Sequence, residues 1–143
     1  MDERLPEPPA EWEYTLHVPH DPLAPGIARA AVGLVLDRHG LPELVDTAVL
    51  LTSELLSNSC RYAPGPASVC LKWADKRLRG SVWDTGPVLP RPADCPGPES
   101  DGGRGLALVE LCADAWGSFG MGPAQGKVVW FELLRDSLRP VTA

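Results

Sequence analysis

The sequence predicts an α+β two-layer sandwich, in which a mixed, mainly antiparallel sheet carries helices on one of its faces. The expected elements follow the order strand, helix, helix, strand, strand, helix, strand, strand, which is not the βαβ alternation of a doubly wound parallel sheet. A chain of 143 residues with 44% hydrophobic residues is also long enough to form one domain with a real core.

The first part of the chain predicts a tail, an edge strand and a helix. Residues 1–11 are acidic and Pro-rich, and we expect them to be disordered because they cannot bury enough surface to offset ordering. Residues 13–18 alternate in the manner of an edge strand, which the segment 19–25 with its prolines ends. Apolar positions at helical spacing then predict a helix over 27–38, with Gly40 as its stop.

Residues 46–63 predict a mostly buried helix around which the domain is organised. Pro42 suits the first turn of this helix, and Pro64 ends it. One face carries apolar or small residues at i, i+4, i+7 spacing, and three further apolar residues widen it. The members of this face are Leu44, Ala48, Leu51, Leu55 and Ser59, widened by Val45, Val49 and Leu56.

One polar stripe is left on the same helix. Glu54 and Asn58 are four residues apart and Arg61 follows three residues later, so that the three side chains share a side. Most charged residues on an amphipathic helix simply face water, and the stripe alone is compatible with that interpretation. Two motifs further along the chain favour the interpretation that the stripe belongs to a functional site.

The second half of the chain predicts a hairpin, a long connection, a helix and two strands. Residues 67–74 and 78–83 alternate around the charged turn 75–77, with Val69, Leu71 and Trp73 on one side. The Pro- and Gly-rich connection 85–104 is long enough to be a functional loop, a lid or disorder. A helix is expected over 105–113, strands over 115–120 and 127–134 around a turn at 122–126, and a frayed tail at the end.

Charge and composition exclude some classes of function. The net charge of −6 comes without a dense cluster of Lys and Arg, so we expect no direct nucleic-acid binding. The acidic start lacks the features of a secretory signal, and no apolar run approaches the roughly 18 residues that cross a bilayer. We therefore expect a cytoplasmic protein that does not contact the membrane.

Four cysteines are scattered through the sequence without a Cys-x-x-Cys pair. We interpret them as reduced thiols, two on helices, one on a strand and one in the long connection. A redox-sensing pair is the alternative. They are, in that order, Cys60, Cys112, Cys70 and Cys95.

The second motif, Asp84-Thr85-Gly86, stands at the end of an expected strand. A carboxylate at a strand end is held rigidly and accepts hydrogen bonds. The same three residues also form ordinary turns.

The third motif, Gly102-Gly103-Arg104-Gly105-Leu106, opens an expected helix. Glycines let the backbone approach phosphate oxygens, and a helix N-terminus presents free N–H groups and the positive end of a dipole. The pattern is weak in isolation and more specific when it follows Asp84-Thr85-Gly86.

Together, the three motifs resemble the GHKL (Bergerat-fold) ATPases, and among them the small anti-sigma-factor serine kinases. The resemblance covers about residues 12–134, flanked by the tails 1–11 and 135–143. It implies ATP and Mg²⁺ as cofactors, Glu54 as the catalytic base and Asn58 as the metal ligand. It further implies that Asp84 accepts the adenine amino group. The residues that it implies in nucleotide binding are Asn58, Arg61, Asp84, Gly86, Gly103, Arg104, Gly105 and Leu106.

The sequence departs from the family pattern at three positions. Tyr62 stands where many relatives carry His, and Val88 where they often carry a second Gly. The third departure lies in the family's final strand, whose start Gly126-Lys127 resembles. These two residues do not form a Walker A loop, because the Ser or Thr of that loop is missing. In that strand we align Val128 with a Thr that lies near adenine in relatives.

The resemblance implies a cytoplasmic anti-sigma factor that binds a sigma factor and phosphorylates an anti-anti-sigma partner of the STAS type. It also implies a homodimer, for which the first strand and helix are candidates. A non-catalytic module that sequesters a partner, with or without ATP, remains an alternative because of Val88 and Val128. A detached histidine-kinase domain is disfavoured, because no pair of phosphoacceptor helices is seen before the domain. Chance motifs on an ordinary α+β domain are the remaining alternative.

Overall fold

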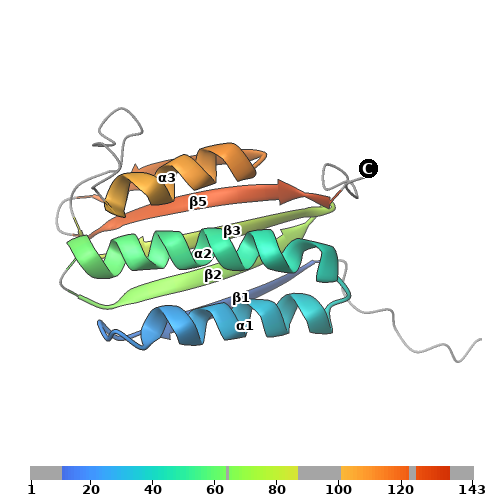
Figure 1. The fold of residues 1–143 in the computed structure, drawn as a ribbon, viewed down its shortest axis with the longest axis horizontal. Helices are drawn as coiled ribbons and strands as arrows, with labels where there is room; N and C mark the ends of the chain where they lie inside the picture. The colour runs from blue at the N-terminus through green and yellow to red at the C-terminus, as the bar shows by residue number, and fades with distance from the viewer. Residues whose placement is uncertain (1–10, 64, 87–100, 123–124, 136–143) are drawn as a thin grey trace, which may run out of the picture.

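The computed structural model describes residues 11–63, 65–86, 101–122 and 125–135, and the side chains of residues 61, 62 and 101–106 lie outside this description. It is an α+β fold with a five-stranded sheet in the order β1-β2-β3-β5-β4 (Figure 1). All four neighbouring pairs are antiparallel, so the expectation of a mixed sheet was wrong on this point. Hairpins join β2 to β3 and β4 to β5. The connection through α1 and α2 makes β2 antiparallel to β1, whereas the connection through α3 makes β4 run parallel to β3, with β5 between them.

The strands agree closely with the alternating segments of the sequence. The edge strand forms at the expected place, and both expected hairpins are present. The strands are β1 (Trp12–Val18), β2 (Ala67–Ala74), β3 (Arg77–Asp84), β4 (Ala115–Gly120) and β5 (Lys127–Leu134).

Two of the three helices begin earlier than expected. Helix α1 spans Ala24–Arg38 and α3 spans Asp101–Cys112, whereas α2 spans Pro42–Tyr62 as expected. Pro25 lies in the first turn of α1, where a proline fits because its missing N–H would have no partner there. In α3 the glycines, which are poor helix formers, lie within the first turns instead of preceding them.

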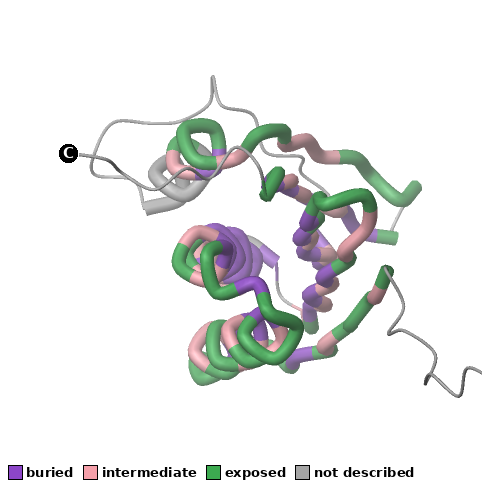
Figure 2. Tube along the Cα trace, turned by 90° about the vertical axis from the view of Figure 1, so that its right-hand side faces the viewer, coloured by how far each residue is buried: buried purple, intermediate pink, exposed green. Residues whose placement is uncertain are grey.

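The helices form one layer on one face of the sheet, with α2 between α1 and α3 (Figures 1 and 2). The expected apolar face of α2 is buried, and it meets the inner side of the strands, where Val69 and Leu71 are 3% exposed. Figure 2 shows this burial as purple along α2 and on the side of the sheet that faces it. Gly80 on β3 leaves room for the ring of Phe131 on β5, since a Cβ there would overlap that ring.

The turn between β2 and β3 consists of Asp75 and Lys76, which have φ angles of 54° and 60°. Two positive φ angles in a two-residue loop are the mark of a type I′ turn, whose twist matches that of the strands. Gly40, which follows α1, has a φ of 74° and confirms the expected helix stop.

Parts of the sequence-based expectations fall outside the described residues. They include most of the connection 85–104, with Val88 and Cys95, and both tails except for Glu11 and Arg135. Arg135 forms an ion pair with Glu43 of α2 (2.6 Å), and its amide donates to the carbonyl of Lys76 (3.1 Å). These two contacts fix Arg135, the residue that follows β5, against α2 and the turn between β2 and β3.

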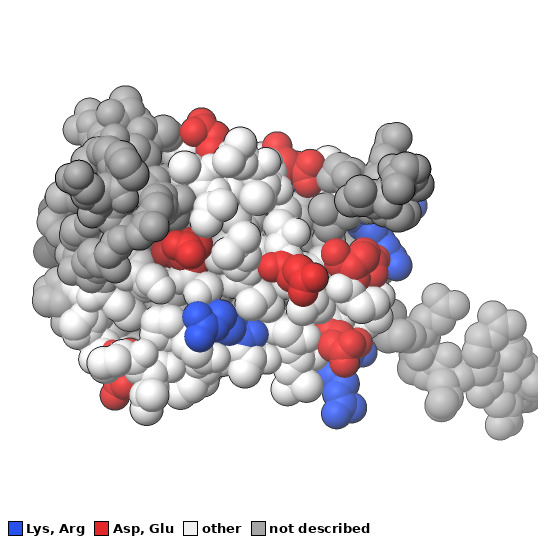
Figure 3. Space-filling view, viewed as in Figure 1, with Lys and Arg blue, Asp and Glu red and all other residues white. Residues whose placement is uncertain are grey.

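Figure 3 shows the helix-covered face, on which acidic and basic side chains are scattered among uncharged ones. None of the described helices is long and apolar enough to cross a membrane.

Candidate functional site

The segments that carry the three motifs meet at one end of the sandwich. In Figure 1 the last turns of α2, the end of β3, the first turns of α3 and the start of β5 all lie at the left end. Ser59 of α2 donates a hydrogen bond to Asp84 at the end of β3, and Asp84 lies opposite Lys127, the first residue of β5. The fold thus gathers motif segments that are far apart in the sequence.

Asp84 is the centre of this end of the molecule. Its side chain is almost fully buried, with the residue 1% exposed, and it accepts hydrogen bonds from α2, from β5 and from the loop after β3. The Ser59 hydroxyl donates to Oδ2 (2.6 Å), while the Gly86 amide (2.8 Å) and the Lys127 ammonium (2.6 Å) both donate to Oδ1. These bonds hold the carboxylate in one orientation and compensate for its removal from water.

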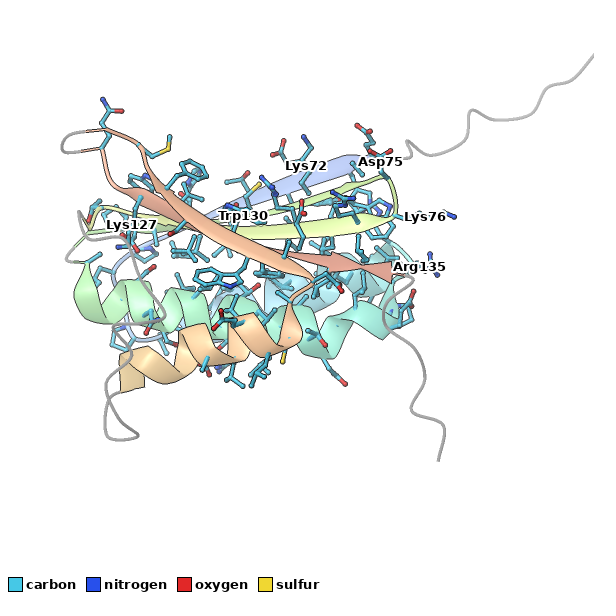
Figure 4. All side chains as sticks on the ribbon, turned by 90° about the horizontal axis from the view of Figure 1, so that it is seen from above. Lys72, Asp75, Lys76, Lys127, Trp130 and Arg135 are labelled. Atoms are coloured by element: carbon cyan, nitrogen blue, oxygen red, sulfur yellow. The ribbon has the colours of Figure 1, made fainter. Side chains whose placement is uncertain are left out.

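Lys127 is the functional residue that sequence reasoning missed. The residue is 8% exposed and forms a buried ion pair with Asp84 at 2.6 Å. A buried lysine is rare unless it is paired, so its place beside the carboxylate is a specific feature of this chain. Figure 4 labels Lys127 at the same end of the sheet, away from Trp130 near the middle.

Val128, which we aligned with a position near adenine in relatives, lies on the other side of the sheet from Asp84. Val128 lies opposite Trp83 in the sheet register, whereas Lys127 lies opposite Asp84. Successive strand residues point to opposite faces, so Val128 points away from the side of Asp84. The two-residue period of β5, in which Lys127, Val129 and Phe131 are all buried, is the signal that could have identified Lys127.

Gly86 closes the site from the side of the long connection. A Cβ at this position would lie 2.7 Å from Lys127 Nζ, 3.1 Å from Asp84 Oδ1 and 3.4 Å from the Ala63 side chain. Only a residue without a side chain fits so close to an ion pair. The neighbouring Thr85 has a buried hydroxyl without a hydrogen-bond partner among the described residues.

The polar stripe of α2 lies beside this network. Glu54 and Asn58 are both half-buried, and Asn58 already takes part in an interaction within the molecule. Asn58 directly precedes Ser59, whose hydroxyl donates a hydrogen bond to Asp84. Asn58 therefore lies at the end of α2 that contacts this carboxylate. The side chain of Arg61 lies outside the described residues.

The glycine motif lies in the first turns of α3. The backbone from Gly103 to Leu106 is helical. The side chains of Arg104 and Leu106 lie outside the described part of the structure. The first amide groups of a helix have no acceptor within it, and they attract anions. The expected opening of a helix is confirmed, although the helix begins at Asp101.

The cysteines that the structure describes are free thiols at the expected elements: Cys60 on α2, Cys70 on β2 and Cys112 on α3. Burial raises the pKa of Cys60, and the negative charge of nearby Asp84 raises it further. Burial is also the main reason why the pKa of Cys70 is raised. Both thiols are therefore protonated at neutral pH.

Within the described part of the chain, no group of three or more His, Cys, Asp or Glu side chains comes together as a metal site. Searches of protein-family models and of curated proteins gave no match to this chain.

Proposed function

We propose that this chain is an ATP-binding serine/threonine protein kinase with a Bergerat-type fold, which acts as an anti-sigma factor in the cytoplasm. The observation that carries the proposal is that the segments of the three motifs lie at one end of the sandwich (Figure 1), where Ser59, Gly86 and Lys127 hold the Asp84 carboxylate. Ordinary surface motifs would not be expected to meet around one buried group.

The residues present fit a nucleotide. Gly86 lies directly against Asp84 and Lys127, and because it has no side chain, it places no further atoms over the ion pair. Asp84 accepts the exocyclic amino group of adenine, and the first turns of α3 bind phosphate oxygens through their amide groups.

The remaining roles belong to α2. Bound ATP supplies the phosphoryl group, and the accompanying Mg²⁺ neutralises charge that develops during its transfer. Asn58 offers an amide oxygen to the metal ion. Glu54, one turn before Asn58, accepts the proton of the incoming hydroxyl. The hydroxyl belongs to a Ser or Thr of a STAS-domain anti-anti-sigma protein, and a sigma factor is the second partner.

The test is transfer of radiolabelled γ-phosphate to such a partner. We expect Glu54→Gln to lower the rate by roughly 10²- to 10⁴-fold, because a general base contributes about this much. Glu110→Gln, which changes an exposed carboxylate on α3, is the matched control and keeps the rate of the parent. Undiminished transfer by Glu54→Gln would remove Glu54 from the mechanism.

A non-catalytic binding module is the second candidate. It is favoured by Lys127, whose ammonium already forms an ion pair at 2.6 Å with Asp84, the carboxylate that would also serve adenine. In this case the chain regulates a partner stoichiometrically. Equal affinity for a sigma factor with and without Mg²⁺–ATP, together with no phosphoryl transfer, would support the module over the kinase.

A further inference from the structure

The Asp84–Lys127 ion pair has hydrogen-bond donor and acceptor positions that no described residue uses. An ammonium group has three N–H donors, and within the described residues Asp84 is the one hydrogen-bond partner of Lys127. A carboxylate has about four acceptor positions, and Ser59, Gly86 and Lys127 use three of them. A buried donor that lacks an acceptor is costly, so this pair favours a ligand that completes it.

The spare positions form a recognisable pattern. Gly86 and Lys127 both donate to Oδ1, so the spare acceptor position of Asp84 is on Oδ2, to which Ser59 alone donates. The spare acceptor and the spare donors of Lys127 therefore belong to one ion pair. The side of adenine that carries N1 presents the complement, because the exocyclic amino group donates and the neighbouring ring nitrogen N1 accepts.

The different burial of Asp84 and Lys127 determines the orientation in which a base would contact them. The side chain of Asp84 is 2% exposed and that of Lys127 is 10% exposed, so the carboxylate is the deeper group. The substituent at C6 is the part of a purine farthest from its sugar, and it reaches deepest when the base enters edge first. In adenine this substituent is an amino group, which suits a carboxylate, whereas guanine would place a carbonyl oxygen against it.

We propose that Lys127 is a second base-reading residue, which donates a hydrogen bond to N1 of adenine while Asp84 accepts from the amino group. This inference rests on the proposed binding of ATP. It assigns to Lys127 a part of the nucleotide specificity that the motifs place on Asp84 alone. A site built on a buried donor rejects a base that lacks the matching acceptor, because the donor is then left unpaired.

The experiment is calorimetric titration of the protein with ATP and with 1-deaza-ATP, in which a C–H group replaces N1. We expect the parent protein to bind ATP at least about tenfold more tightly, since a hydrogen bond from a charged donor contributes this much or more. Lys127→Met should bind both nucleotides equally and ATP about tenfold more weakly than the parent. Lys72→Met, which changes an exposed lysine on β2, is the control and keeps the preference.

Each outcome decides a different point. If the parent binds both nucleotides equally, Lys127 does not read N1 and the inference fails, although ATP binding stands. This comparison needs no variant, so it holds even if Lys127→Met does not fold. If Lys127→Met binds ATP more tightly than the parent, the ammonium competes with the base, and the inference also fails. If the folded parent binds neither nucleotide, both the inference and the proposed ATP binding are wrong.

Discussion

Gly86 is the residue on which the geometry of the site depends most directly. Its amide donates to Asp84 Oδ1 (2.8 Å), and its Cα lies so close to the ion pair that a Cβ would come within 2.7 Å of Lys127 Nζ. A side chain at this position would therefore require the Lys127 ammonium to shift, and a shift away from Asp84 would weaken the ion pair. Loss of that contact would leave a buried charge poorly paired.

We expect Gly86→Ala to lower the free energy of unfolding by about 1–3 kcal/mol, the usual cost of overpacking a buried site. Urea denaturation measures the change. Gly120→Ala on β4 is the control, because a Cβ there meets no atom within 4 Å. Equal stability of Gly86→Ala and the parent would show that the ion pair can shift without cost.

The pKa of the Cys60 thiol depends in part on the charge of Asp84. Its pKa is raised by burial and then by the negative charge of Asp84, so the folded protein keeps the thiol proton to higher pH than the unfolded chain does. The stability that this proton contributes is complete below the ordinary thiol pKa and is lost as pH rises through the raised value in the folded state. Stability should therefore fall on the alkaline side.

Alkylation measures this directly. We expect the rate at Cys60 to rise with pH along a curve whose midpoint lies above the ordinary thiol pKa, and Asp84→Asn to move that midpoint to lower pH. Mass spectrometry of the labelled peptides separates Cys60 from Cys70, whose pKa is also raised but without a contribution from Asp84, so its curve should not move. A Cys60 midpoint that Asp84→Asn leaves in place would contradict the expectation.

The type I′ turn between β2 and β3 is the clearest local strain at the scale of elements. Lys76 has a φ of 60°, a conformation that costs a residue with a Cβ about 1–2 kcal/mol and glycine much less. The charged residues at this turn make the hairpin visible in the sequence, but they do not reveal the turn type.

Lys76→Gly should raise the free energy of unfolding by about 0.5–1 kcal/mol, because glycine is favoured at the second position of such a turn. Urea denaturation is again the measurement. Lys72→Gly, within β2, is expected to act in the opposite direction, since glycine weakens the interior of a strand. A destabilised Lys76→Gly protein would mean that the lysine side chain contributes contacts that outweigh the backbone strain.

The elements that could be predicted from sequence are those with strong periodicity. The apolar face of α2 and the alternation of β4 and β5 led to their observed positions. The starts of α1 and α3 could not be predicted in this way. Pro25 is compatible both with a break in the chain and with the first turn of a helix, and Gly102, Gly103 and Gly105 are poor helix formers. In the site, Asp84 stood out by its motif. Lys127 did not, because its role depends on a register between strands that are distant in sequence.

For the molecule as a whole, α2 is the element that joins the two layers. Its position between α1 and α3 brings Leu51 into the centre of the core, where it is fully buried, while the adjacent Leu50 is 39% exposed. Global stability should therefore respond very differently to the same change at these two neighbouring positions.

Leu51→Ala should lower the free energy of unfolding by about 2–5 kcal/mol, because it removes buried methyl groups and leaves a cavity. Leu50→Ala is the matched control and should cost clearly less, since part of that side chain is already in water. Thermal or urea unfolding of both variants gives the comparison. Similar losses at the two positions would contradict the central place of α2.

The strand order has a consequence for how the protein is made. β5 follows β4 in the chain but lies between β3 and β4, and Lys127 comes 43 residues after Asp84. During synthesis on the ribosome, β3 therefore emerges with an uncovered edge and a carboxylate that still lacks its ammonium partner. The end of the sandwich that holds this ion pair is then the last part to assemble, so a nascent chain that stalls before β5 would expose the edge of β3 and could not yet pair Asp84 with Lys127.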